Sequence, residues 1–117
     1  PIYTQQTRTI AATSTHDNGA WIPLDMFASP FNVSFGIKLL SGGNAINYRV
    51  QHTFDDVFDP TATIVGFNHV DVTAAQASVP GPVTDGNYAF PVRATRLVVT
   101  SAASAASFTF TVIQAGT

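Results

Sequence analysis

The alternation of residues between Phe31 and Leu40 constrains the fold of this chain more than any other feature. Large apolar residues occupy every second position of the segment, namely Phe31, Val33, Phe35, Ile37 and Leu39. A period of two places them on one face of a β-strand, whereas a helix would scatter them around its surface. The segment therefore predicts a strand with one face in the core.

Two pairs of such segments predict two β-hairpins. In the first, residues 46–54 repeat the alternation after the glycine-rich loop Ser41-Gly42-Gly43-Asn44. In the second, the alternating segments 88–100 and 107–114 flank a turn of small residues at 101–105. Alternating runs joined by short loops of this composition are typical of hairpins.

Composition extends the β interpretation to the whole chain. The 117 residues include no Glu and one Lys, Lys38, while Thr, Val, Ala and Phe abound. Helix formers are thus scarce, and strand formers dominate. Turn signals about every ten residues predict seven or eight short antiparallel strands in one all-β domain over 1–117, a jelly-roll-like or immunoglobulin-like β-sandwich. We expect its core to contain Phe31, Phe35, Tyr48, Phe54, Phe108 and Phe110.

The remaining segments give weaker expectations. Residues 1–13 predict an edge strand or an N-terminal arm, and Asp17-Asn18-Gly19, after His16, predicts a turn. A short strand over 20–24 should end at an edge, because Pro23 cannot donate a ladder hydrogen bond. We further expect a short strand over 63–69, one helical turn over 73–77 and a loop over 79–87.

Charge is unusually sparse. Only 10% of the residues are charged, the net charge is −2 and the pI is near 5.8. The chain lacks the basic patch of a nucleic-acid binder and the ~18-residue apolar run of a membrane span. The absence of cysteine excludes disulfides and thiolate chemistry. Low charge favours a subunit of an assembly, and a monomer solvated by Thr, Ser, Asn and Gln remains the alternative. Pro1 fits removal of an initiator Met after cytosolic synthesis, although a trimmed signal or tag would leave the same end.

The densest polar group could hold a cation. It comprises His52, Asp55, Asp56, Asp59, His69 and Asp71. Carboxylate oxygens bind calcium or magnesium, but the spacing matches no EF-hand loop. The alternative, which we prefer, is a turn in which the Asp side chains accept backbone N–H bonds.

Other candidate sites are weaker still. Ser14 with His16 and Asp17 suggests a hydrolase dyad, but no nucleophile elbow accompanies it. Gly42-Gly43 is too short for a phosphate loop. Trp21, Tyr48 and Tyr88 could stack on a sugar or could simply be core residues. Arg93 and Arg96 should point to opposite faces of a strand, where one could anchor an interface. We therefore predict no catalytic, cofactor-binding or metal-ligating residue, and no enzyme.

Four segments carry a resemblance to known proteins. They are Val50–Asp56 (VQHTFDD), Asn68-His69, Asp85–Val92 (DGNYAFPV) and Thr111–Gln114 (TVIQ). Their course resembles that of small proteins encoded among the virion structural genes of tailed bacteriophages, the head decoration or cement type in particular. The resemblance covers residues 50–114 and includes no catalytic or metal motif, and residues 1–30 carry none.

The resemblance implies a β-sandwich subunit on the outer surface of a phage capsid, made in the host cytoplasm. Its partners would be the major capsid protein and further copies of itself, with a trimer favoured. The segment over 1–13 is polar and nearly uncharged, and as an arm it would contact a neighbour or the shell. Such a protein stabilises the assembled head by binding only that state. A carbohydrate-binding or receptor-binding β-sandwich, and a small tail or neck component, remain the alternatives.

Overall fold

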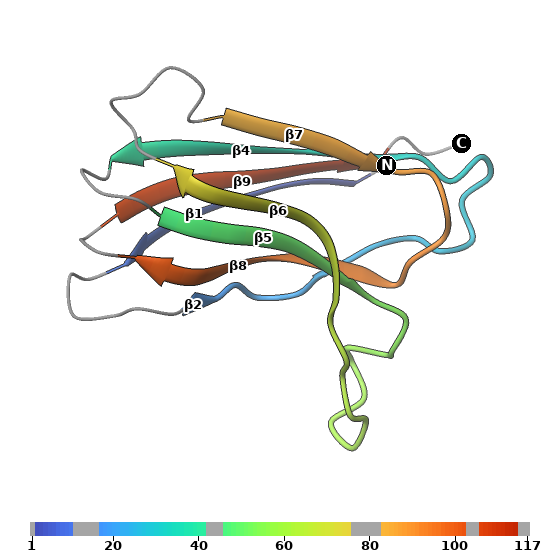
Figure 1. The fold of residues 1–117 in the computed structure, drawn as a ribbon. Helices are drawn as coiled ribbons and strands as arrows, with labels where there is room; N and C mark the ends of the chain where they lie inside the picture. Colours follow the sequence, from blue (N-terminus) through green and yellow to red (C-terminus); the bar gives the residue numbers. More distant parts are fainter. Residues whose placement is uncertain (1, 11–16, 42–45, 76–82, 103–105, 115–117) are drawn as a thin grey trace.

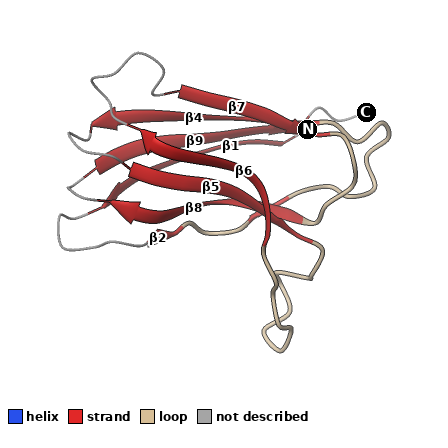
Figure 2. Ribbon diagram, in the orientation of Figure 1, coloured by secondary structure: helices blue, strands red, loops and turns tan. Residues whose placement is uncertain are grey.

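The computed structural model describes residues 2–10, 17–41, 46–75, 83–102 and 106–114. These residues form nine β-strands in two antiparallel sheets, and no helix occurs among them (Figures 1 and 2). The strands are β1 (Ile2–Ile10), β2 (Asp17–Asn18), β3 (Ile22–Pro23), β4 (Val33–Ser41), β5 (Ile46–Thr53), β6 (Phe67–Ala75), β7 (Val83–Tyr88), β8 (Ala94–Ala102) and β9 (Ala106–Gln114). The predicted all-β class is confirmed.

The strand order is that of a jelly roll. The first sheet has the order β1-β9-β4-β7, and the second has the order β2-β8-β5-β6, with β3 beside β8 as well. Every connection crosses between the sheets except β2–β3 and β5–β6. Since β2 and β3 both pair with β8 on its outer side, eight strand positions result. The β-sandwich prediction is therefore confirmed, with nine strands where seven or eight were expected.

Both predicted hairpins are wrong. β4 pairs with β7 and β9, while β5 pairs with β6 and β8, so the two strands of the first hairpin lie in different sheets. The same holds for β8 and β9. Alternation reports which face of a strand is buried and does not report which strand lies beside it. A chain can pass between layers about 10 Å apart as readily as it turns within one sheet.

The core lies between the sheets and follows the alternation closely. Its apolar members are Ile22, Leu24, Phe31, Val33, Phe35, Ile37, Leu39, Ile46, Tyr48, Val50, Tyr88, Val92, Leu97, Val99, Ala106, Phe108, Phe110 and Val112. Of the six predicted core aromatics, Phe54 is the exception, with 48% of its surface exposed. β5 ends at Thr53, and His52 and Thr53 are both buried, so the alternation stops before Phe54.

Several local expectations also need correction. Asp17 and Asn18 form β2 rather than a turn. The next residue, Gly19, has no room for a side chain, because a Cβ there would lie 2.5 Å from the carbonyl oxygen of Leu97. β7 occupies much of the predicted loop over 79–87, and β6 extends to Ala75, through the start of the predicted helical turn. In each case cross-strand pairing prevails over local propensity. The edge strand ending at Pro23 is confirmed as β3.

The N-terminal segment is an edge strand of its own sheet. β1 pairs with β9 at nine successive positions, from Ile2 opposite Gln114 to Ile10 opposite Ala106. An arm free for a neighbouring chain is therefore wrong for residues 2–10, while residues 11–13 lie outside the described ranges. Backbone hydrogen bonds to β9 hold this strand although its side chains are only weakly apolar.

Candidate functional site

The phenylalanines divide between the core and one end of the sandwich. Of the nine in the chain, Phe31, Phe35, Phe108 and Phe110 are buried, and five are exposed. Those five lie where β5 and β7 finish and β4, β6 and β8 begin, in the connecting loops or at the first residue of β6. We call this group the aromatic end; it consists of Phe27, Phe54, Phe58, Phe67 and Phe90.

The loop over 54–66 carries the most prominent part of the aromatic end. It extends away from both sheets between β5 and β6 (Figure 1). Its backbone is held from within, because Asp56 accepts a hydrogen bond from the Phe58 N–H at 3.0 Å, and Asp59 accepts one from the Thr61 N–H at 2.9 Å. Together with the Thr61 hydroxyl, that N–H holds the pKa of Asp59 below its ordinary value. The loop therefore presents its apolar residues from a hydrogen-bonded frame.

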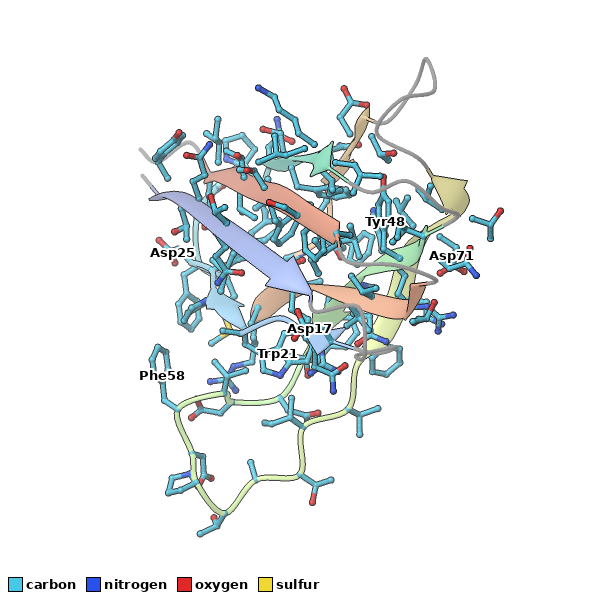
Figure 3. All side chains as sticks on the ribbon, turned by 90° about the vertical axis from the view of Figure 1, so that its left-hand side faces the viewer. Asp17, Trp21, Asp25, Tyr48, Phe58 and Asp71 are labelled. Atoms are coloured by element: carbon cyan, nitrogen blue, oxygen red, sulfur yellow. The ribbon has the colours of Figure 1, made fainter. Side chains whose placement is uncertain are left out.

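Phe58 and Phe27 stand beside one cleft. Phe27 is 83% exposed and Phe58 is 77% exposed; Figure 3 shows Phe58 at the outer margin of its loop. The cleft has a volume of about 170 Å³ and is also lined by Met26, Val57 and neighbouring residues. Beside it, Arg93 forms an ion pair with Asp56 at 3.7 Å, so the cleft has an apolar rim and one charged pair.

The other three phenylalanines surround a buried histidine. The His52 ring packs against Phe54, Phe67 and Phe90 with centroid distances of 5.4, 5.8 and 5.6 Å. Its Nδ1 lies 3.3 Å from the Tyr88 hydroxyl, with which it shares a hydrogen bond. Burial lowers the pKa of His52, and nearby His69 lowers it further.

Burial is also the main influence on the pKa of Tyr88. It raises the pKa of Tyr88 to about 12, despite a hydrogen bond with Thr95 that acts the other way. His69 stacks on the Tyr88 ring at 4.1 Å and donates its Nε2 hydrogen to the Asn87 carbonyl at 2.8 Å. Both histidines are thus occupied in an aromatic cluster.

The residues considered for a cation site are not arranged as one. Asp55 accepts hydrogen bonds from the Val65 N–H at 2.8 Å and the Thr53 hydroxyl at 3.3 Å, and Asp56 and Asp59 also cap turns in the loop. Asp71 instead pairs with Arg49 at 3.2 Å. Within the described ranges, no three His or Asp side chains are placed to share a metal ion. These contacts agree with the turn interpretation of the three carboxylates.

The three aromatics considered for a sugar platform do not lie together on the surface. Tyr48 and Tyr88 are buried. Trp21 lies under the guanidinium of Arg96, whose carbon is 4.2 Å from the ring centroid. Arg96 also donates two hydrogen bonds to Gln51, at 2.8 and 3.0 Å.

Two other sequence candidates include residues outside the described ranges. Gly42 and Gly43 both lie outside them. Of the residues in the suggested hydrolase site, Ser14 and His16 also lie outside, and Asp17 lies in β2. Sequence reasoning missed the aromatic end altogether. The available signal was the position of Phe27 and Phe58 in turn-rich segments without alternation, where an apolar ring has no core face to join.

Comparison with known proteins adds little. No protein family and no curated protein sequence matches this chain. Among solved structures, a chain from work on Bacillus endospore appendages, described as a novel family of disulfide-linked pili, aligns over 98% of this chain and 89% of its own length. The TM-score is 0.43 and the identity is 16%, too low to support an argument. No helix in the described part of the chain is long and apolar enough to cross a membrane.

Proposed function

We propose that this chain is a non-enzymatic structural subunit of a phage virion, a decoration protein that binds the assembled head through its aromatic end. The observation that carries the proposal is the gathering of five exposed phenylalanines at one end of the sandwich. Exposed aromatic clusters mark protein interfaces, where aromatic anchors supply much of the binding energy. The resemblance of residues 50–114 to virion proteins supports the choice of the phage head as the partner.

The energetics favour binding through this end. Burying one phenylalanine side chain contributes about 1.5–3 kcal/mol, and Phe27 and Phe58 are largely exposed. The hydrogen-bonded loop over 54–66 already holds Phe58 in place, which reduces the ordering cost on binding. Stabilisation of the head then follows by mass action, since a ligand of the assembled shell alone favours that shell.

The charges at this end indicate what the partner surface carries. Four acidic residues, Asp25, Asp55, Asp56 and Asp59, lie in its loops, while Arg93 is the basic residue beside them. The complementary surface on the major capsid protein should therefore contain apolar pockets bordered by Lys or Arg. Raising the salt concentration should slow association more than it speeds dissociation.

Co-sedimentation with purified phage heads tests the proposal. The double variant Phe27→Ser/Phe58→Ser should lose at least tenfold in affinity, because it removes both anchors of the cleft. The control is Leu40→Ser, which changes an exposed apolar residue on β4, near the opposite end of the first sheet. Equal binding by the double variant, or no binding by the unmodified chain, would contradict the proposal.

Self-association is the second part of the proposal. A decoration protein of this size would occupy symmetry positions on the shell as a homo-oligomer, with a trimer expected. Light scattering after size exclusion measures the state directly. A monomer at every concentration up to the millimolar range would restrict the chain to binding the shell as single copies.

A further inference from the structure

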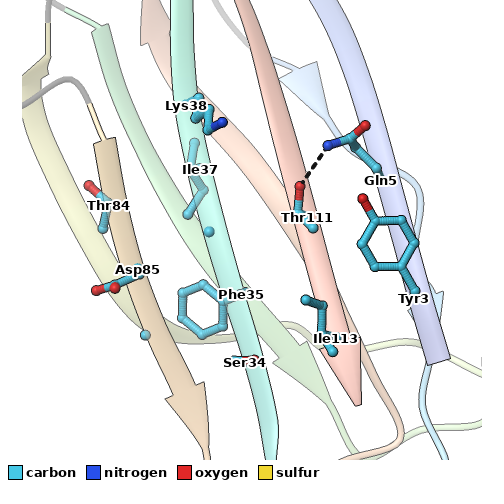
Figure 4. A pocket seen from close by; sticks show the side chains of 12 residues that line it. Tyr3, Gln5, Ser34, Phe35, Ile37, Lys38, Thr84, Asp85, Thr111 and Ile113 are labelled. Carbon is cyan, nitrogen blue, oxygen red and sulfur yellow. Dashed lines mark hydrogen bonds between the residues drawn. The ribbon is translucent and has the colours of Figure 1, made fainter. Parts of the chain in front are cut away.

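The outer face of the first sheet holds a trough of about 780 Å³. Its walls come from β1, β4, β7 and β9, with Tyr3, Gln5, Thr111 and Ile113 on one side (Figure 4). Cross-strand register explains the arrangement. One row across the sheet joins Tyr3, Ile113 and Ser34, and the next joins Gln5, Thr111, Gly36 and Asp85.

Gly36 leaves the middle of this trough open. It lies inside β4, which pairs with both β7 and β9, and a glycine inside a strand weakens that strand. A Cβ built at this position would meet nothing within 4 Å. The fold therefore does not require glycine at residue 36, and any side chain added there would occupy the trough.

The lining combines an apolar platform with neutral hydrogen-bonding groups. Tyr3 is 67% exposed and lies opposite Ile113, which is 46% exposed. In the adjoining row the Gln5 amide donates to the Thr111 hydroxyl at 3.1 Å. Lys38 and Asp85 also line the trough, one positive and one negative side chain, so the lining carries no net charge.

We propose that this trough binds a neutral oligosaccharide. A sugar ring has apolar C–H faces that stack on an aromatic ring, and hydroxyl edges that need amide, hydroxyl and carboxylate partners. A phosphorylated or sulfated ligand would require more than the single cation, Lys38. An extended peptide pairs with a sheet edge, whereas the trough lies on the sheet face. The site is separate from the aromatic end, so the two proposals can fail independently.

The test uses the full chain and an array of immobilised neutral hexasaccharides of glucose, mannose, galactose and N-acetylglucosamine, followed by calorimetry with the bound sugar. We expect at least one hexasaccharide to bind. Tyr3→Ala should weaken that binding at least tenfold, and Gly36→Ile should abolish it. Phe58→Ser, at the aromatic end, should leave it unchanged.

Gly36→Ile also provides its own folding control. Isoleucine is favoured in strands, and a Cβ at this position meets nothing within 4 Å, so the variant should melt at or above the temperature of the unmodified protein. Binding of no hexasaccharide overturns the proposal, as does binding that survives in Gly36→Ile. A change of oligomeric state in Gly36→Ile, with no sugar bound by the unmodified chain, would assign the trough to self-association instead.

Discussion

His52 should make the stability of the protein sensitive to mild acid. Burial lowers its pKa, so the folded state favours the neutral imidazole, while the unfolded chain protonates near pH 6.5. The free energy of unfolding should therefore be constant above about pH 7 and fall as the pH drops below 6.5. His52→Gln, which cannot titrate, should reduce this loss between pH 7 and pH 5. Urea unfolding at pH 5, 6, 7 and 8 measures the effect, and an unchanged pH dependence in His52→Gln would contradict it.

Phe35 should be among the most costly side chains to remove. It is 3% exposed, and its ring contacts those of Tyr88 and Phe110 at 5.6 and 6.3 Å. Phe35→Ala should lower the free energy of unfolding by about 3–5 kcal/mol, as measured by urea unfolding. A loss below about 1 kcal/mol would show that the ring is not a core residue.

Gly86 gives a second test of the same contact. A Cβ at Gly86 would lie 2.6 Å from the tip of the Phe35 ring, which covers the glycine. Gly86→Ala should therefore cost about 1–3 kcal/mol through overpacking. In the Phe35→Ala background, where the ring is absent, the same change should be nearly neutral. Additive losses in the double variant would exclude the contact.

At the scale of the element, β1 should be necessary to its sheet. Deleting residues 1–10 removes nine paired positions and leaves one side of β9 without a neighbour. We expect a lower free energy of unfolding and aggregation through the uncovered edge of β9. Urea unfolding and size exclusion measure both effects. Unchanged stability of the truncated chain would show that residues 1–10 act as an arm and are not needed by the sheet.

The loop over 54–66 should hold its shape without a cation. Its carboxylates accept hydrogen bonds from backbone N–H groups of Phe58, Thr61 and Val65. EDTA should therefore leave the melting temperature unchanged, whereas Asp55→Ala should lower it by removing the bond to Val65. A fall of several degrees in EDTA would instead identify a bound cation.

At the scale of the whole molecule, sequence predicts the inner faces of strands well and their neighbours poorly. Alternation identified Val33, Phe35 and Ile37 as core residues because burial repeats locally with the pleat. It could not distinguish a hairpin from a crossing between layers, since both bury the same residues. The β7 strand was missed because its TDGN core has turn composition, and pairing with β4 overrides that preference.

The aromatic end lay beyond sequence reasoning for a related reason. Phe27, Phe58 and Phe90 belong to three connections that are distant in the chain. They share one end of the molecule only because β4, β5, β7 and β8 are arranged in opposed directions. The trough depends likewise on register, which sets Tyr3 opposite Ile113. The local composition of the sequence reveals neither the shared position of these loops nor the register of the strands.

The position of β9 between β1 and β4 has a consequence for synthesis of the protein. β9 is the last of the nine strands along the chain, yet two other strands of its sheet pair with it. A growing chain can assemble β5, β6 and β8 while β1 still lacks its partner. β1 must therefore remain unpaired until translation has passed Gln114, although β4 and β7 can pair with each other before then. Ribosome pausing before that codon would prolong the interval in which the chain is open to aggregation.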